Sequence, residues 1–395
     1  MPELIYLDAA ASTPIAPEAL SATVEALQQA GNPSAAHVAG RSAAASVESA
    51  REAIAQLSHV GPAGVIFVGS ATEANNLAIR GLALSDERRE VVTTSAEHPS
   101  VLATVNDVAA SGVATHVVPV TNTGEVDLTA LAAVLSDKTA IVSIHAANNE
   151  TGVIQPLYEI VELARAVGAA VHVDASQLMA WGETDLIDEC DFVTISSHKM
   201  YGPQGAAALI ARPSVRKRLR PQVTGGGQER GMRSGTLNVA AIRGFGAAAE
   251  LSLDSGHAAA ISIRALRAKL LGGLTRAIGD VIEHGAKADR QLPGILNVAI
   301  GTHWSDSVES EALLARLPRI AASTGSACHS GAPEPSPVLL AMGVPPEEAA
   351  RSIRLSLSRY TTEANINDAI AELGRGYSEL RSLLGAIRND ERYTQ

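Results

Sequence analysis

The chain has 395 residues, which is more than one compact core usually holds, so we expect two domains. Hydrophobic residues make up 46% and charged residues 18%, the balance of a soluble globular protein. The formal net charge of −11 argues against direct binding of nucleic acid, because such a protein needs a basic face to displace counterions from phosphates.

Short apolar runs alternate with helical patterns from about residue 64 to 212. The runs are rich in β-branched residues and lack polar alternation, as in strands buried on both faces of a mainly parallel sheet. The predicted strands are 65–68, 91–94, 140–144, 170–173 and 192–195, with crossover helices over 129–135 and 158–167. This alternation predicts an α/β fold.

After about residue 260 the pattern changes to a helix, two shorter strands and a terminal helix. These elements are predicted over 263–274, 295–300, 352–357 and 366–383. We therefore expect a large α/β domain over 16–260, with a mainly parallel sheet flanked by helices. A smaller α+β domain is expected from 1–15 and 261–395.

Polar residues follow each predicted strand, in the segments 71–73, 97–98, 148–150, 174–177 and 196–199. In an open parallel sheet the carboxyl ends of the strands are where ligands bind. Any one cluster is compatible with an ordinary polar loop, but five at equivalent ends indicate a single binding site.

Four residues of these clusters suit one cofactor. Lys199 at a buried strand end is costly unless it is paired or chemically used, and desolvation favours Schiff-base formation, although a surface turn is the alternative. Asp174 suits a protonated pyridine nitrogen, or a helix cap. Thr72 begins a helix, where phosphate binds well. His98 suits ring stacking or acid–base chemistry, or a structural role.

The sequence resembles the NifS/IscS-like cysteine desulfurases of the class V aminotransferase family over nearly its whole length. The resemblance rests on the segments YLDAAA (6–11), SATEANN (70–76), EH (97–98), NNETG (148–152), HVDASQ (172–177), SHKMYGP (197–203), GGGQERGMRSGT (225–236), GSAC (325–328) and SIRLSL (352–357). It implies a pyridoxal 5'-phosphate (PLP) enzyme that converts L-cysteine to L-alanine and delivers the sulfur to an acceptor protein.

The resemblance also implies a role for each matching residue. Lys199 is the lysine that binds PLP covalently, and Asp174 faces the pyridine nitrogen. Gln177 contacts the ring hydroxyl, and His98 stacks on the ring and moves protons. Ala71 and Asn149 are further cofactor contacts. Thr72, Ser196 and His198 hold the phosphate, with Thr236 from a second subunit of a homodimer. Asn149 and Arg354 bind the substrate carboxylate.

The resemblance makes Cys328 the sulfur acceptor, and its Gly/Ser/Pro-rich segment suits a thiol that visits the cofactor and then presents the sulfur elsewhere. Cys190 is flanked by acidic residues that disfavour a thiolate, so we expect it to be non-catalytic. With only two cysteines a disulfide framework is implausible. His145 and His172 lack the spacing of a metal site, so no metal is expected.

Two alternatives to a cysteine desulfurase remain. The first is a selenocysteine lyase or another aminotransferase-type PLP enzyme. The second is a catalytically silent sulfur-transfer scaffold, which the presence of Lys199 and Cys328 argues against. No signal peptide or membrane-spanning stretch is visible, so a cytoplasmic protein without a membrane partner is expected.

The pathway that the acceptor serves is open between iron–sulfur cluster assembly, tRNA thiolation and DNA phosphorothioation. Housekeeping members of the family end in a longer tail, whereas only a short polar stretch follows the predicted last helix, which favours a dedicated acceptor. The basic run 212–220 is either the solvated face of a surface helix or a docking patch for an acidic partner.

Overall fold

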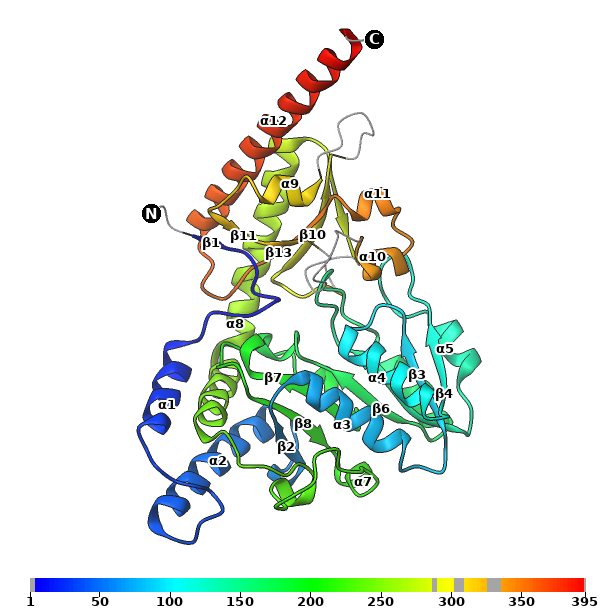
Figure 1. Cartoon of the computed structure of the whole chain (residues 1–395), viewed down its shortest axis with the longest axis vertical. Helices are drawn as coiled ribbons and strands as arrows, with labels where there is room; N and C mark the ends of the chain where they lie inside the picture. The colour runs from blue at the N-terminus through cyan, green and yellow to red at the C-terminus, as the bar shows by residue number, and fades with distance from the viewer. Residues whose placement is uncertain (1–3, 286–289, 302–308, 325–334, 394–395) are drawn as a thin grey trace.

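The computed structural model describes residues 4–285, 290–301, 309–324 and 335–393. Its largest element is a seven-stranded sheet with the strand order β2-β8-β7-β6-β5-β3-β4. The strands are β2 (Val65–Val68), β3 (Glu90–Thr94), β4 (Ala114–Val118), β5 (Thr139–His145), β6 (Ala170–Asp174), β7 (Phe192–Ser196) and β8 (Ala207–Ala211). Strands β4, β3, β5, β6 and β7 are parallel, and β8 is antiparallel to both of its neighbours. The sheet confirms the expected mainly parallel α/β architecture (Figure 1).

Helices cover both faces of this sheet. They are α1 (Pro17–Leu27), α2 (Val38–Leu57), α3 (Ala71–Ala83), α4 (Pro99–Ala110), α5 (Leu128–Val134), α6 (Leu157–Ala166), α7 (Pro213–Arg216) and α8 (Val239–Ile278). Side chains alternate between the faces, so Ile141 packs in the cluster with α3 and α4, whereas Val142 packs in the cluster with α2, α6 and α8. Both clusters exclude water, which explains the continuous apolar runs in the central strands.

A smaller antiparallel sheet with the order β12-β13-β10-β9 follows in the chain. Its elements and neighbours are β9 (Val281–His284), β10 (Ile295–Ile300), α9 (Ser310–Leu314), β11 (Ile320–Ala321), β12 (Ser323–Thr324), α10 (Pro337–Ala341), α11 (Pro346–Ala349), β13 (Ser352–Ser356) and α12 (Glu363–Tyr393). The N-terminal β1 (Ile5–Tyr6) pairs in parallel with β11, so the first residues lie with this later part of the chain.

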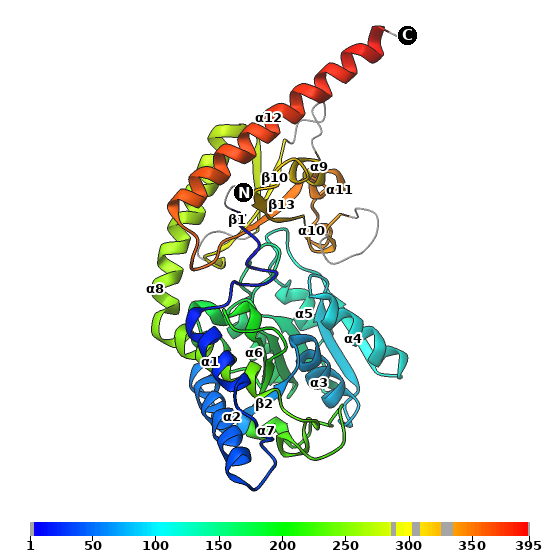
Figure 2. The same ribbon diagram turned by 60° about the vertical axis from the view of Figure 1, so that its left-hand side comes forward.

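Helix α8 joins the two parts, and α12 packs along its second half (Figure 2). Its 40 residues exceed the helix predicted over 263–274, although they include glycines, which have low helix propensity. The structure instead uses them for close packing: a Cβ at Gly246 would lie 2.6 Å from Ala50 Cα, and one at Gly273 would lie 2.2 Å from Ile370 Cδ1. Among the described residues, no helix has the length and apolar character needed to cross a membrane.

The expected surface helix over the basic run 212–220 is wrong in extent, since only Pro213–Arg216 is helical. Much of its charge is also used inside the chain. Arg212 Nε donates to the Cys190 carbonyl at 2.8 Å, Arg216 binds the Ala63 carbonyl, and Arg218 forms an ion pair with Asp86. These contacts weaken the interpretation of the run as a docking patch.

Candidate active site

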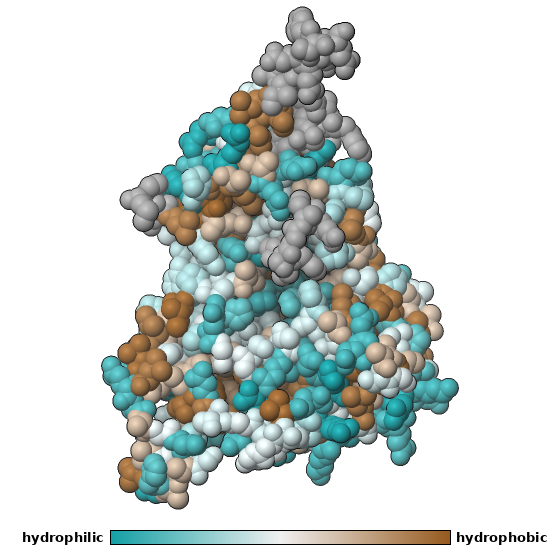
Figure 3. All heavy atoms as spheres, viewed as in Figure 1, coloured by the Kyte–Doolittle hydropathy of each residue, from teal (hydrophilic) through white to brown (hydrophobic). Residues whose placement is uncertain are grey.

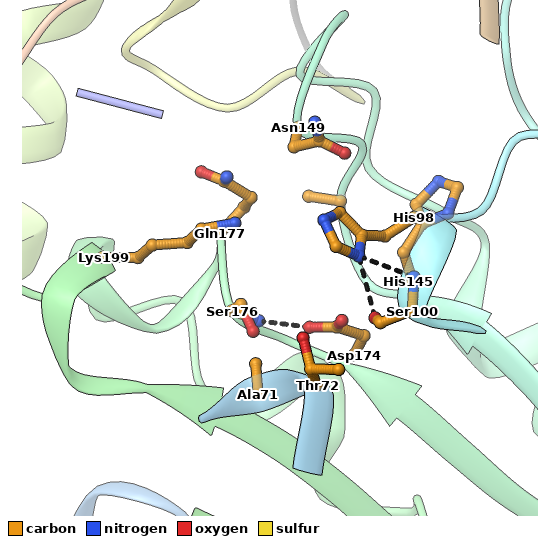
Figure 4. Close-up of a pocket in the computed structure, with 11 residues that line it drawn as sticks. Ala71, Thr72, His98, Ser100, His145, Asn149, Asp174, Ser176, Gln177 and Lys199 are labelled. Atoms are coloured by element: carbon orange, nitrogen blue, oxygen red, sulfur yellow. Dashed lines mark hydrogen bonds between the residues drawn. The ribbon is translucent and has the colours of Figure 1, made fainter. Parts of the chain in front are cut away.

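The carboxyl ends of the parallel strands meet at one edge of the main sheet, where a pocket opens. Asp174 at the end of β6 lies level with His145 on β5 and Thr194 on β7. The pocket holds about 360 Å³ of empty space, part of it open to solvent. Its lining residues are Ala71, Thr72, His98, Ser100, His145, Ala147, Asn149, Asp174, Ser176, Gln177 and Lys199 (Figure 4).

Asp174 is a buried carboxylate with a donor on each oxygen. The Ser176 amide donates to Oδ1 at 3.0 Å, and Asn75 Nδ2 donates to Oδ2 at 2.8 Å. Burial alone would raise the pKa of Asp174, but hydrogen bonds from Ser176 and Asn75 and the charge of Lys199 outweigh it and hold the pKa below its ordinary value. The carboxylate is therefore ionised and offers a negative charge to a cationic group in the pocket.

His98 caps the N-terminus of α4 and projects into the same pocket (Figure 4). Its Nδ1 accepts the Ser100 amide at 3.1 Å and lies 2.8 Å from Ser100 Oγ. Burial lowers the pKa of His98, and the positive charge of Lys199 lowers it further against the opposing charges of Asp174 and Glu97. The ring is therefore neutral at neutral pH, and an amide that donates to Nδ1 leaves the ring proton on Nε2.

Lys199 lies on the short helical turn that follows β7, and the N-terminal segment holds this turn in place. The Thr13 amide and hydroxyl both donate to the His198 carbonyl, at 2.8 and 2.9 Å. Thr13 Oγ1 also accepts the amide of Tyr201, a residue with φ of 67°, at 2.8 Å. Burial and the charge of Lys199 lower the pKa of His198 to about 4, so this imidazole is neutral beside the lysine.

The same N-terminal segment contacts two more of the predicted site residues. Gln177 Nε2 donates to the Ala10 carbonyl at 2.8 Å, and Arg354 Nη2 forms an ion pair with Asp8 at 2.8 Å. Arg354 lies on β13, is 7% exposed, and donates through Nη1 to the Asn149 carbonyl at 3.1 Å. Among the described residues its Nε has no hydrogen-bond partner. Sequence reasoning selected Arg354 but not Asp8, which supplies its counter-charge.

Helix α3 presents its N-terminus to the pocket through Ala71 and Thr72. Ser70 caps the helix, since its Oγ accepts the Glu73 amide at 3.2 Å. The amides of Ala71 and Thr72 come before the first intrahelical hydrogen bond, which the Ala74 amide makes to the Ser70 carbonyl. Free amides, a threonine hydroxyl and the positive end of the helix dipole together suit a phosphate group.

Thr236 lies outside the pocket of its own chain and is exposed. The segment 225–236 that ends in Thr236 is held at its centre by Glu229, whose carboxylate accepts two hydrogen bonds from Arg51, each at 2.8 Å. The Phe67 amide also donates to Glu229 at 2.8 Å. These contacts retain Glu229 and Arg230 at positive φ values of 49° and 55°, so the segment has a fixed and unusual path.

The pocket brings together seven of the predicted residues: Ala71, Thr72, His98, Asn149, Asp174, Gln177 and Lys199. Ser196, His198, Thr236 and Arg354 do not line it, and Cys328 falls outside the described residues. Sequence reasoning did not select Ser100, His145 or Ser176 for the site. His145 directly follows the predicted strand 140–144 and Ser176 lies within the polar segment 174–177, whereas Ser100 carries no such signal.

The two histidines that the sequence analysis considered for a metal site are buried and have protein partners. His172 lies between Ser143 Oγ at 2.8 Å and Thr194 Oγ1 at 3.0 Å, and burial lowers its pKa to about 4. His145 Nε2 lies 3.0 Å from Gln155 Nε2, and its Nδ1 lies 2.9 Å from Glu97 Oε1. Both rings are explained by packing and polar contacts within the sheet.

Cys190 is 1% exposed, and burial together with the charge of Asp191 raises its pKa to about 12. The expected suppression of the thiolate is confirmed, but burial is a larger cause than the acidic neighbours that the sequence displayed. The thiol is inaccessible and protonated, so it does not suit nucleophilic chemistry.

A lysine and a buried, ionised aspartate that face one pocket are the pair found in PLP enzymes. Residues 5–368 match the family model described as aminotransferase class-V, and the chain therefore belongs to this family. It is 39% identical over 384 residues to the cysteine desulfurase IscS of Anaeromyxobacter sp. (strain Fw109-5), covering 96% of this chain and 94% of the relative. Family members of this kind depend on PLP.

Solved structures agree with the sequence relatives. A NifS-like protein superposes with a TM-score of 0.86 at 32% identity, covering 95% of this chain and 99% of that chain. SspA in complex with cysteine superposes with a TM-score of 0.77 at 30% identity, covering 90% and 99% of the respective chains. These likenesses cover the main sheet and the smaller sheet together.

Proposed function

We propose that this chain is a PLP-dependent cysteine desulfurase that converts L-cysteine to L-alanine and takes the sulfur onto Cys328 as a persulfide. The observation that carries the proposal is that Lys199 and the ionised, buried carboxylate of Asp174 line one pocket. Membership of the family and the cysteine desulfurase relatives support the same reaction.

The pocket residues fit PLP in three respects. The carboxylate of Asp174 is buried and ionised, which suits a protonated ring nitrogen. The N-terminus of α3 offers the amides of Ala71 and Thr72 to a phosphate. Lys199 lines the same pocket, and its charge acts on both Asp174 and His98. Ser196 and His198 flank Lys199 and are proposed as further phosphate contacts.

When bound, PLP supplies an electron sink for the electron pair left on the substrate carbon. The chain's own residues do the rest. Asp174 would keep the proton of the ring nitrogen in place, Gln177 would contact the ring hydroxyl and His98 would stack on the ring. Lys199 takes the proton from the α-carbon of L-cysteine. His98, neutral and protonated on Nε2, can hold a reacting sulfur through a hydrogen bond from Nε2, and it can give that proton up once Nδ1 has taken one.

The sulfur transfer forms one bond and breaks one. The thiolate of Cys328 attacks the substrate sulfur, a sulfur–sulfur bond forms, and the carbon–sulfur bond breaks with its electron pair remaining on carbon. Protonation of that carbon gives L-alanine, and Cys328 carries the persulfide. No external oxidant or reductant is needed, because the two electrons that the substrate sulfur gives up stay on the carbon, which then takes a proton.

Arg354 and Asn149 are proposed to bind the substrate carboxylate. A guanidinium binds a carboxylate through two parallel hydrogen bonds, and Arg354 has an unpartnered Nε among the described residues. The Asn149 side chain lines the pocket, while its carbonyl accepts from Arg354, so the two residues lie together. Asp8 in the N-terminal segment balances the positive charge of Arg354.

A homodimer with composite sites is part of the proposal. Thr236 of the partner subunit would complete the phosphate site, because in its own chain Thr236 is exposed and outside the pocket. Helix α1 shows an apolar face beside the start of α8, the helix that follows Thr236 (Figure 3). That face consists of Leu20, Val24 and Leu27, which are 48%, 41% and 71% exposed. Burial of such a face against a second copy is favourable.

The persulfide is proposed to pass to an acceptor protein. Iron–sulfur cluster assembly, tRNA thiolation and DNA phosphorothioation all remain candidate pathways for it. Arg212, Arg216 and Arg218 of the basic run form contacts within the chain, so the run favours none of these pathways.

The function is tested by product analysis of the purified, PLP-loaded protein. With L-cysteine it should release alanine and sulfide in equal amounts in the presence of a thiol reductant. Selenocysteine tests the lyase alternative, and L-alanine with a 2-oxo acid tests the aminotransferase alternative. Faster turnover of selenocysteine than of cysteine, or transamination without sulfide, would reject the proposal, as would the absence of any product.

A further inference from the structure

A chain of side-chain hydrogen bonds lies behind the pocket and connects Asp174 to His98. Its centre is Asn75 on α3, which is fully buried. Asn75 Nδ2 lies 2.8 Å from Asp174 Oδ2 and 2.9 Å from Ser100 Oγ. Ser100 Oγ in turn lies 2.8 Å from His98 Nδ1.

Each bond in this chain has only one possible direction. The ionised carboxylate of Asp174 can only accept, so the amide nitrogen of Asn75 is the donor and the reversed amide would place two oxygens together. The second hydrogen of that nitrogen goes to Ser100 Oγ. The Ser100 hydroxyl hydrogen is then left for His98 Nδ1, which also accepts the Ser100 amide at 3.1 Å.

The arrangement leaves one group unsatisfied. Among the described residues, Asn75 Oδ1 has no hydrogen-bond partner, although it is completely buried. Buried polar atoms without partners are rare and unfavourable. The amide orientation is therefore set by its two acceptors, Asp174 and Ser100, and not by the needs of its own oxygen.

We infer that Asn75 and Ser100 are positioning residues that couple the carboxylate of Asp174 to the tautomer of His98. Asn75 holds Asp174 Oδ2 in place, and Ser100 keeps the His98 proton on Nε2. The inference rests on the proposed function, in which Asp174 serves the cofactor and His98 serves the thiols. Neither Asn75 nor Ser100 was selected from the sequence.

Other charged groups near His98 must be considered in a pH experiment. Lys199 lowers its pKa from the turn after β7, whereas Asp174 on β6 and Glu97, the residue before it, raise it. His145 on β5 lines the same pocket. Substitution of Ser100 changes none of these charges, so a shift in the His98 titration reports the lost hydroxyl.

The decisive variant is Ser100→Ala, which removes the hydroxyl and keeps the amide. A protonated Nδ1 cannot accept the Ser100 hydroxyl hydrogen, so this hydrogen bond favours the neutral ring. Loss of the hydroxyl should therefore raise the His98 pKa by roughly half a unit to one unit, which matches the free energy of one hydrogen bond. The readout is the ¹⁵N shift of His98 in protein labelled with [¹⁵N]histidine, assigned by the signal lost in His98→Gln. Ser100→Thr, which keeps a hydroxyl, should restore the parent titration, and Ser111→Ala at the exposed end of α4 should not change it.

The same variants are then assayed with L-cysteine. Ser100→Ala and Asn75→Ala should each lower kcat about 3- to 10-fold with little change in KM, and the double variant should lose no more than the worse single one, because both break one chain. An unchanged His98 titration in Ser100→Ala, or an equal effect of Ser100→Thr, would overturn the inference. The histidine titration does not depend on turnover, so a protein that makes no alanine would reject the proposed function and leave this readout intact.

Discussion

Substitution of Glu150 by glutamine should make the protein more stable at alkaline pH. Glu150 follows Asn149, is 8% exposed, and its Oε2 accepts a hydrogen bond from Ser336, the cap of α10. Burial raises the pKa of Glu150 to about 7, against the opposing effects of the Ser336 hydrogen bond and the charge of Arg354. The folded protein therefore binds the Glu150 proton more tightly than the unfolded chain does.

The sign and size of the effect follow from that difference. With an unfolded pKa of 4.5, stability from this group is fully present below pH 4.5 and is lost as the pH rises through about 7. The loss is about 3 kcal/mol, at ~1.4 kcal/mol for each pKa unit. For 395 residues this corresponds to a fall of roughly 4 °C in the unfolding midpoint.

The assay is thermal unfolding of the parent and Glu150→Gln at pH 4.5 and 8.5. Glutamine still accepts from Ser336 but carries no charge, so the two midpoints should be similar at pH 4.5 and the variant should be higher by roughly 4 °C at pH 8.5. Glu52→Gln, at an exposed position in α2, is the matched control and should show no such difference. An equal gap between parent and Glu150→Gln at both pH values would refute the reasoning.

Three further predictions concern the proposed site. Lys199→Ala should abolish the visible absorbance of covalently bound PLP, so a band that survives dialysis and borohydride treatment unchanged contradicts the role of Lys199. Arg354→Lys should raise KM for L-cysteine at least tenfold, since an ammonium lacks the two-pronged geometry, and an unchanged KM would remove Arg354 from substrate binding. Sedimentation should show a dimer. Thr236→Ala should weaken the retention of PLP and leave the dimer intact. An active monomer at working concentration would refute the composite site.

The positions of the buried strands and of the pocket were predictable because both follow from local patterns. The run 170–173 is continuously apolar, and Asp174 directly follows it, so parallel pairing brings Asp174 beside the end of β5. Strand β8 was not predicted, because three alanines in five residues have low strand propensity, and burial between β2 and β7 decides its structure.

The contacts behind the pocket could not be predicted from the sequence. The hydrogen bond from Asn75 to Ser100 joins two helices 25 positions apart, and its direction depends on the ionisation of Asp174 on a third element. The ion pair between Asp8 and Arg354 spans 346 positions and requires the N-terminal segment to lie against β13. Neither contact leaves a periodic signal along the chain.

The central claim is that Cys328 takes sulfur from L-cysteine, and a single-turnover labelling experiment tests it most directly. The PLP-loaded protein is mixed with L-[³⁵S]cysteine without reductant, alanine is counted, and the labelled peptide is identified. We predict one alanine for each protein-bound sulfur, with the label on the peptide that contains Cys328 and unchanged labelling in Cys190→Ser. Alanine formation at the parent rate in Cys328→Ser, or label on Cys190, would contradict the account.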